Sequence, residues 1–391
     1  MAYPRDANAS MFKLIDANHA ILVVILCAAF LFYKYMLQNF PSVMASQLMD
    51  SFHLQGVGLG VLSGVYFWTY LIVPLFVGVI LDYYGTRWVT SGAIFCCAIG
   101  VFIFSHAEQL NMAIWGRAIV GVGVSFATVA YLKLACIWFP KKYYALLTSL
   151  LVAAAMMGAV CGQMPLAWLI HHVGWRASLS DLGWVGVILT VLFLIFVREP
   201  TSTFLSSIES KNNQAWENQH LWYGILSAVK NKQNWLLTGY SGLAFAPVVI
   251  FCGLWGNLFL QKAYNLDKLI APTLISLVFV GLGIASPLFA VFASHIRNRC
   301  SFMFYSTLIS AASIGLVIYA HPMPIWMLGG LLFLFGFSLD AFPMVFTKRE
   351  FFISRATKRI NHAANAIVLK NYDIIVVSLN TKRIQNLIFK K

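Results

Sequence analysis

Long apolar stretches separated by short polar segments dominate the chain. A membrane-spanning helix takes about 20 predominantly apolar residues. Ten stretches come within a few residues of this length: 20–40, 57–81, 88–106, 111–138, 144–170, 182–198, 235–260, 270–294, 301–320 and 324–347. Backbone groups in lipid must be hydrogen-bonded internally, and runs of this length satisfy that condition as helices. The pattern therefore predicts an all-α, polytopic integral membrane protein.

The composition supports a membrane protein and excludes several classes. Hydrophobic residues make up 60% of the chain, charged residues only 10%, and the mean hydropathy is +0.78. Soluble domains are nearer half apolar and a quarter charged, so a soluble enzyme, a disordered protein and a secreted disulfide scaffold are excluded. The seven cysteines lie in or beside apolar stretches without ligand spacing, which favours neither disulfides nor a metal site.

The basic charge is concentrated at one end of the chain. The net charge is +14, and 348–391 alone holds ten basic and two acidic residues. This distribution reflects membrane topology and a basic tail, so we expect no nucleic-acid partner.

The remaining basic residues predict the orientation, because positively charged loops lie on the cytoplasmic side. With the N-terminus in the cytoplasm, three basic residues fall in outer loops: Arg176, Lys262 and Lys268. Eleven fall in cytoplasmic segments: Arg5, Lys13, Arg87, Lys141, Lys142, Arg198, Lys211, Lys230, Lys232, Arg297 and Arg299. We therefore expect a cytoplasmic N-terminus, in what is most simply a bacterial inner membrane.

The longest polar stretch divides the chain into two groups of helices. We expect a six-helix bundle at 1–198, a cytoplasmic linker at 199–234, four further helices at 235–347 and a basic non-membrane tail at 348–391. The turn at 78–87 is echoed 212 residues later at 290–299, where Arg299 takes the place of Arg87 and Ser294 that of Asp82. Two related halves are a recurring design of secondary transporters.

Several motifs resemble the Major Facilitator Superfamily. Gly78, Asp82, Gly85 and Arg87 match its Gly-x-x-x-Asp-x-x-Gly-x-Arg loop between helices two and three, and the run 117–123 is similar to its motif in helix four. Four further segments resemble a bacterial branch related to the lysosomal dipeptide transporters: 32–44, 138–142, 174–176 and 254–256. The resemblance implies a two-bundle fold and transport by alternating access.

The 78–87 turn is expected to act as a conformational latch, as its counterpart does in the superfamily. Gly85 permits positive φ in the turn, and Gly78 is expected to allow close approach of a neighbouring helix. Asp82 could accept hydrogen bonds from an arginine or face the positive end of a helix. The alternative is a plain turn with a solvated charge and Arg87 beside it.

Two basic residues inside spans are the main candidates for substrate binding. A charge within a span costs at least ~2.5–3.5 kcal/mol, so it normally faces the bundle interior or water. Lys34 stands with Tyr35, Gln38 and Asn39 on helix one, a set suited to a carboxylate, and Arg117 in helix four could bind an anionic group. The alternatives are snorkelling of Lys34 and a structural role for Arg117.

Weaker candidates complete the proposed pathway. Tyr66, Tyr70 and Gln163 could contact the substrate, although aromatic residues in a span more often pack. Lys133 and Asp340 are candidates for proton coupling, with snorkelling and helix capping as the alternatives.

The sequence contains no arrangement of residues that is typical of a catalytic site. No phosphate-binding Gly-x-x-x-x-Gly-Lys motif occurs, so ATP is not expected, and paired carboxylates and metal-ligand spacings are missing from the spans. We expect no cofactor and no enzymatic activity, with protons as the candidate coupling ion.

The expected function is secondary active or facilitative transport of a small organic solute, with an amino acid or short peptide favoured, by a monomer in the bilayer. The alternatives are an organic-anion or sugar-phosphate transporter and a non-transporting sensor or scaffold. The superfamily has twelve helices, and the sequence predicts ten. We therefore expect 348–391 to be an out-of-frame replacement that impairs transport, or a genuine basic tail that contacts anionic lipid.

Overall fold

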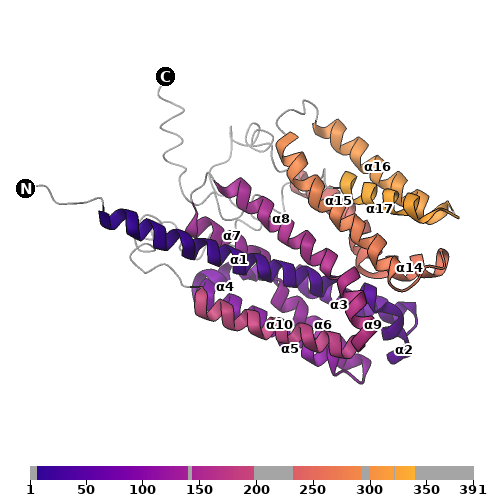
Figure 1. The fold of residues 1–391 in the computed structure, drawn as a ribbon, viewed down its shortest axis with the longest axis horizontal. Helices are drawn as coiled ribbons and strands as arrows, with labels where there is room; N and C mark the ends of the chain where they lie inside the picture. The colour runs from indigo at the N-terminus through magenta and orange to yellow at the C-terminus, as the bar shows by residue number, and fades with distance from the viewer. Residues whose placement is uncertain (1–6, 140–142, 198–231, 293–298, 321, 340–391) are drawn as a thin grey trace, which may run out of the picture.

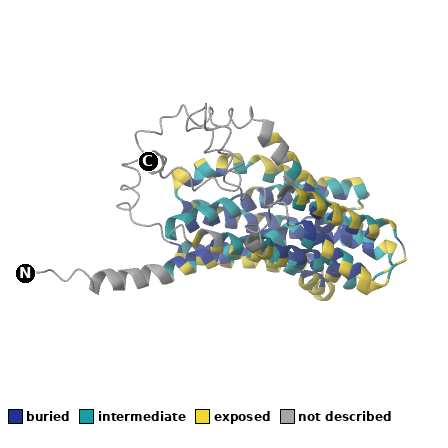
Figure 2. Cartoon of the chain, turned by 90° about the horizontal axis from the view of Figure 1, so that it is seen from above, coloured by how far each residue is buried: buried dark blue, intermediate teal, exposed yellow. Residues whose placement is uncertain are grey.

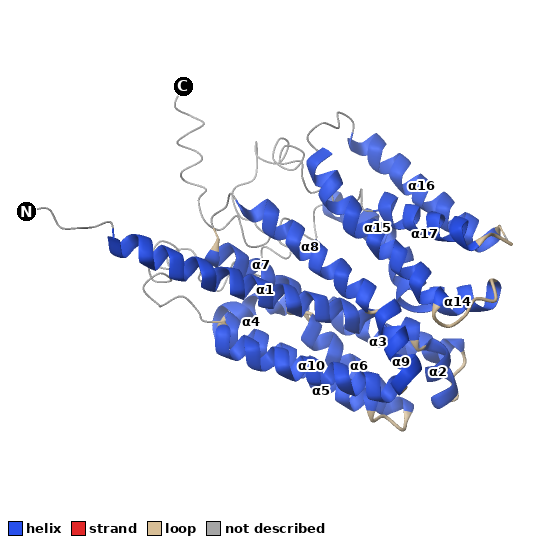
Figure 3. Ribbon diagram, viewed as in Figure 1, coloured by secondary structure: helices blue, strands red, loops and turns tan. Residues whose placement is uncertain are grey.

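The computed structural model describes residues 7–139, 143–197, 232–292, 299–320 and 322–339. Within these ranges every regular element is a helix (Figure 3). The first group of helices comprises α1 (Ala7–Val43), α2 (Ala45–Ser51), α3 (Gly56–Ile72), α4 (Pro74–Tyr84), α5 (Thr86–Ser105), α6 (Leu110–Val124), α7 (Ala127–Trp138), α8 (Tyr144–Cys161), α9 (Met164–Val173) and α10 (Trp175–Phe196). The second comprises α13 (Lys232–Pro247), the π-helix η2 (Val248–Trp255), α14 (Gly256–Ala263), α15 (Ile270–Phe292), α16 (Arg299–Tyr319) and α17 (Ile325–Leu339).

The helices account for the ten predicted spans. Eight helical segments of the described residues are long and apolar enough to cross a membrane, and the bent pair α3–α4 makes a ninth. The tenth predicted span contains α17, which is described as far as Leu339. The prediction of an all-α, multi-pass membrane protein is confirmed.

The start of the sixth span was predicted wrongly. The helix begins at Trp175 rather than at 182, directly after Gly174 at φ +83°. Its first two turns carry the polar residues Arg176, Ser178, Ser180 and Asp181, which end the apolar stretch in the sequence without ending the helix. The Ser178 hydroxyl donates to the Gly174 carbonyl at 2.7 Å, so its hydrogen bond is made to the backbone one turn earlier.

Prolines bend or break two of the spans. The axis of the second span turns by 53° between α3 and α4, where Pro74 opens α4. The fifth span breaks at Gly162 and Gln163, just before Pro165 in the first turn of α9. Proline has no N–H to donate to the preceding turn, so a helix ends or bends beside it.

The two groups form two bundles that pack side by side (Figure 1). Helices α1 to α10 form one bundle and α13 to α17 the other, with α8 lying between α1 and α15. Buried residues gather inside this packing and exposed residues lie at its edges (Figure 2). Small residues let the helices touch: a Cβ on Gly158 would lie 2.2 Å from the Phe32 carbonyl oxygen, and one on Gly336 2.0 Å from that of Val278.

Candidate functional site

The turn between α4 and α5 has the conformation that its glycine predicts. Gly85 has φ +83° and ψ +148°, a backbone conformation that is essentially restricted to glycine. Arg87 follows in the first turn of α5, and its guanidinium donates to the Leu194 carbonyl of α10 through both Nε and Nη2. Arg87 therefore ties the turn to the end of the sixth span.

Asp82 is paired with a residue that the sequence analysis assigned to another role. Its carboxylate lies 2.7 Å from Nζ of Lys133 on α7, and the same ammonium group donates to the Leu81 carbonyl at 2.7 Å. The partner of Asp82 among the described residues is therefore a lysine of helix four, not the arginine or helix end that was expected. Lys133 is bound at this helix end rather than snorkelling freely.

Gly78 does not provide the close helix approach that was predicted for it. A Cβ built on Gly78 would meet no atom within 4 Å, in contrast to Gly158. The small residue at this position is therefore not explained by packing against the described helices.

Lys34 is buried in the N-terminal bundle and hydrogen-bonded to two hydroxyls. Its side chain is 1% exposed, and Nζ lies 2.8 Å from the Tyr70 hydroxyl and 3.2 Å from Thr128 Oγ1. The ammonium group also lies over the rings of Tyr70 at 4.5 Å and Tyr35 at 4.9 Å. Cation–π contacts strengthen when they are desolvated, so this lysine is held inside the bundle and does not reach an interface.

Arg117 is completely buried and only partly satisfied. Its Nη1 donates to the Leu37 carbonyl of α1 at 3.0 Å, while Nε and Nη2 have no partner among the described residues. The guanidinium lies between the rings of Phe40 and Tyr66, each 4.6 Å from Cζ. The hydrogen bond to the Leu37 carbonyl agrees with a structural role for Arg117. A buried cation is costly when its donors are not bonded, so the two donors without a partner among the described residues point to a second role as well.

Stacked tyrosines connect the two cations. Tyr66 and Tyr70 are one turn apart on α3, and their rings are parallel to within 6° with centroids 6.2 Å apart. Arg117 lies against Tyr66 and Lys34 against Tyr70, so one continuous stack runs from α6 through α3 to α1. The Tyr66 hydroxyl is buried and has no hydrogen-bond partner among the residues that the structure describes. We call Lys34, Tyr70, Tyr66 and Arg117 the cation–tyrosine stack.

The other helix-one candidates face the second bundle or lie beside it. Tyr35 packs against the core of the second bundle, and Gln38 is half-buried one turn after Lys34. Asn39 is 2% exposed, bonds the Tyr35 carbonyl at 3.0 Å, and lies 3.9 Å from the Cβ position of Gly253 on η2. These residues place the stack next to the boundary between the bundles.

Gln163 bridges the bundles instead of facing an open pathway. Its Nε2 donates to the Cys252 carbonyl of η2 at 3.0 Å, and its Oε1 accepts from Asn257 Nδ2 at 2.8 Å. The same Asn257 amide donates to Ser42 Oγ at 2.9 Å. Both ends of the Gln163 amide are thus engaged by the second bundle.

Sequence reasoning missed Thr128, Ser42 and Asn257. Each is a small polar residue in an apolar helix, and such residues commonly bond to their own backbone, so the type alone does not indicate a site. Of the three, only Asn257 could have been noticed in the sequence, because a side-chain amide within a span must find hydrogen-bond partners.

Asp340 and the tail 348–391 lie outside the described residues. Within the described ranges no group of three metal-ligating side chains occurs.

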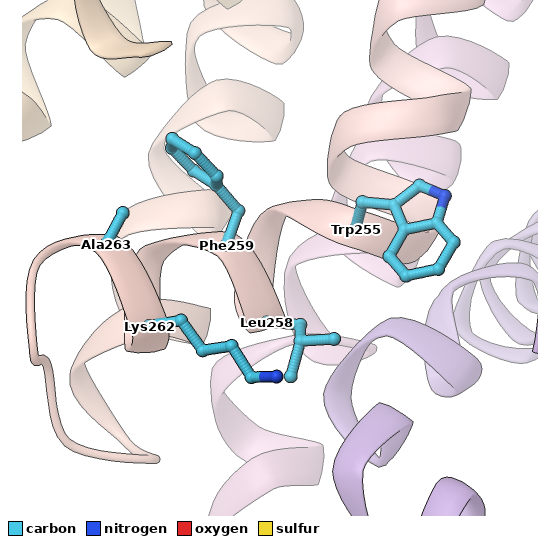
Figure 4. A pocket seen from close by; sticks show the side chains of 5 residues that line it. All are labelled: Trp255, Leu258, Phe259, Lys262 and Ala263. Atoms are coloured by element: carbon cyan, nitrogen blue, oxygen red, sulfur yellow. The ribbon is translucent and has the colours of Figure 1, made fainter. Parts of the chain in front are cut away.

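A hollow of about 410 Å³ lies away from the stack, along α14. Its lining residues are Trp255, Leu258, Phe259, Lys262 and Ala263 (Figure 4). Trp255 and Phe259 project in different directions from Lys262, so the side chains do not converge on a ligand position. This hollow lacks the few convergent polar groups that orient a small molecule.

Comparison with known proteins identifies the family. The model of the Major Facilitator Superfamily matches residues 24–358. An uncharacterized transporter of Bacillus subtilis strain 168, YybO, is 27% identical over 242 residues, which is 58% of this chain and 54% of that protein. The probable galactarate/D-glucarate transporter GudP of Escherichia coli K12 is 24% identical over 50% of this chain and 44% of that protein. The lysosomal dipeptide transporter MFSD1 of Homo sapiens is 24% identical over 70% of this chain and 61% of that protein.

A solved structure has the same fold. The crystal structure of a bacterial homologue of the human lysosomal transporter Spinster, in an inward-facing and occupied conformation, superposes with a TM-score of 0.64 at 14% identity, covering 86% of this chain and 76% of that chain. The chain spans about half the length of the first curated relatives it matches. These relatives are described as transporters and not as enzymes, as the sequence predicted. The chain belongs to the Major Facilitator Superfamily.

Proposed function

We propose that this protein is a secondary transporter that moves a carboxylate-bearing small organic solute by alternating access. An amino acid or short peptide is the favoured solute, and the cation–tyrosine stack is its binding region. The observation that carries the proposal is the burial of two basic side chains, Lys34 and Arg117, that have no carboxylate within ion-pair distance among the described residues. A buried charge without a counter-charge is costly, and a solute carboxylate removes that cost.

The free edge of Arg117 matches the chemistry of a carboxylate. Nε and Nη2 form one side of the planar guanidinium, and both lack a partner in the part of the chain that the structure describes, whereas Nη1 is held by the Leu37 carbonyl. Two parallel N–H donors fit the two oxygens of a carboxylate in a bidentate pair. The rings of Phe40 and Tyr66, each 4.6 Å from Cζ, hold the guanidinium in place together with the Leu37 carbonyl.

The relatives support the same chemical class. One is described as a dipeptide transporter and another as a probable galactarate/D-glucarate transporter, and all of these solutes carry carboxylates. In our proposal Lys34 takes a second acceptor group of the solute, and Tyr35, Gln38 and Asn39 line its approach from the bundle boundary. Protons remain the candidate coupling ion, no cofactor is bound, and Asp340 stays a coupling candidate outside the described residues.

Uptake into proteoliposomes tests the proposal. Purified full chain is reconstituted, and uptake of radiolabelled alanyl-alanine is measured with unlabelled dipeptides, glucarate or glucose 6-phosphate as competitors. We expect competition by dipeptides, and loss of uptake in Lys34→Ala and Arg117→Ala. Arg117→Lys should also fail, because an ammonium group cannot replace the two-donor edge. Lys262→Ala and Arg176→Ala, which remove exposed basic residues away from the stack, should transport normally.

A dicarboxylate is the second candidate solute, favoured by the match to GudP. In that case glucarate competes better than dipeptides, while the Lys34 and Arg117 variants still lose uptake. Uptake that is unchanged in both variants would remove the stack as the binding region.

A further inference from the structure

The two bundles are joined by a buried hydrogen-bonded cluster that is separate from the cation–tyrosine stack. It consists of Ser42 on α1, Gln163 between α8 and α9, Asn257 on α14, and the Cys252 carbonyl of η2. Three hydrogen bonds of 2.8 to 3.0 Å connect these groups: Gln163 to Cys252, Asn257 to Gln163, and Asn257 to Ser42. Gln163 is 0% exposed, and Ser42 and Asn257 are 1% exposed. We call this cluster the interbundle clamp.

The local backbone places the Gln163 side chain and the Cys252 carbonyl where they can bond to each other. Pro165 breaks the fifth span, so Gln163 lies at a helix start with its side chain turned toward the second bundle. On the other side, η2 bonds in the wider π pattern, and the Gly256 N–H donates to the Phe251 carbonyl. The next carbonyl, that of Cys252, accepts from the Gln163 side chain. π-Helical turns of this kind are rare and occur frequently at functional sites.

The position of the clamp makes it sensitive to the relative movement of the bundles. Its members lie near α2, α9 and α14, at the end of the molecule away from the N-terminus (Figure 1). Every bond in it crosses from one bundle to the other, so the bundles cannot separate at this end while the bonds persist. All the groups are neutral, and bonds between neutral groups can be exchanged for bonds to water at modest cost.

We infer that the interbundle clamp is a gate: it holds this end of the transporter closed in the observed state and opens when the bundles rock to the opposite state. The inference rests on the proposed alternating access. Gln163 is then a gating residue and not a solute ligand. Ser42 shares α1 with Lys34 and Asn39, so occupation of the stack and closure of the gate act on the same helix. Within the described ranges the buried Asn257 Oδ1 has no partner, which leaves the hydrogen bonding of the clamp incomplete and makes it easier to open.

Hydrogen–deuterium exchange with mass spectrometry tests the gate without a solute. The full chain in lipid nanodiscs is compared with Gln163→Leu, Asn257→Leu and the milder Ser42→Ala. Thr190→Val is the matched control, because its buried hydroxyl bonds only to the Gly186 carbonyl of its own helix among the described residues. We expect exchange in segments 36–44 and 248–262 to rise by about fivefold in Ser42→Ala, which loses one bond of the clamp, and by about tenfold or more in the two leucine variants, which lose two bonds each.

If the clamp is a gate, its opening must also change the opposite end of the molecule. When the clamp opens, the bundles should close at the other end, so exchange in 81–90 and 134–139 should fall in the same variants. Faster exchange at the clamp end alone would mean that the cluster only packs the bundles, and it would overturn the inference, as would unchanged exchange at both ends. If the leucine variants do not fold, Ser42→Ala decides between these outcomes. Because no transport is read, the result is independent of which solute the protein carries.

Discussion

The two stacked tyrosines of α3 have opposite environments at the level of single atoms. The Tyr70 hydroxyl accepts from the Lys34 ammonium group at 2.8 Å, whereas the Tyr66 hydroxyl is buried with no partner in the described part of the chain. A hydrogen bond to a charged group contributes more to stability than one between neutral groups, and a buried unpaired hydroxyl costs free energy. The same chemical change at the two positions should therefore have different effects.

Removal of the two hydroxyls should separate their roles. We expect Tyr70→Phe to lower the free energy of unfolding by about 1.5 kcal/mol, the low end for a charged hydrogen bond, because Thr128 remains as a second acceptor for Lys34. Tyr66→Phe should leave stability unchanged or raise it slightly, since it removes an unsatisfied group. Thermal unfolding of the purified variants in one detergent compares the two. Equal destabilisation of both would refute this account of the stack.

The sequence predicted part of this residue-level picture. Lys34 and Arg117 could be singled out because a charge inside an apolar span is costly in free energy and is normally paired or functional. The contacts of Arg117 with Leu37 and of Lys34 with Thr128 join residues 80 and 94 positions apart, respectively. Their geometry depends on how the helices pack, and no local pattern contains it.

At the level of elements, helix packing shows which glycines are needed for two helices to approach closely. Gly158 on α8 and Gly162 directly after it both lie against α1, with a Cβ at Gly158 only 2.2 Å from a backbone oxygen. Gly78 belongs to the signature turn but has open space around its Cβ position. Motif membership and close packing are therefore separate properties.

Alanine substitution should distinguish these two glycines. We expect Gly158→Ala to destabilise the fold by about 1–3 kcal/mol, because α8 must move away from α1. Gly78→Ala should be neutral or stabilising by up to ~1 kcal/mol, since glycine is a poor residue within a helix. Thermal unfolding of the two variants provides the measurement. A strong loss of stability in Gly78→Ala would indicate that another segment packs there.

Element boundaries show where sequence patterns succeed and fail. The predicted spans match the described helices closely wherever an apolar run ends at a charged or glycine-containing turn, as at Gly85. The sixth helix was started too late, because its polar first turns resemble a loop in hydropathy. The breaks beside Pro74 and Pro165 have an evident cause in the sequence, and the π-helix at 248–255 likewise begins directly after a proline, Pro247.

At the scale of the whole molecule, two bundles meet along α1, α8, η2 and α15. The polar segment at 199–234 and the echo of the 78–87 turn predict a division into six helices and four further ones, which stays a prediction because 198–231 and 340–391 lie outside the described residues. The clamp could not be predicted, because its residues come from three segments separated by about a hundred positions each. The arrangement places the cation–tyrosine stack inside one bundle and the clamp between the two.

Discrimination between a free and an amidated dipeptide tests the central claim most directly, because the buried cations are proposed to bind a carboxylate. Uptake of radiolabelled alanyl-alanine by the reconstituted wild-type chain is measured with unlabelled alanyl-alanine or its C-terminal amide as competitor. The account predicts that the free dipeptide competes and that the amide is weaker by about a hundredfold or more, since a buried polar group left unpaired rejects an analogue strongly. Equal competition by the acid and the amide would contradict a carboxylate site at Lys34 and Arg117.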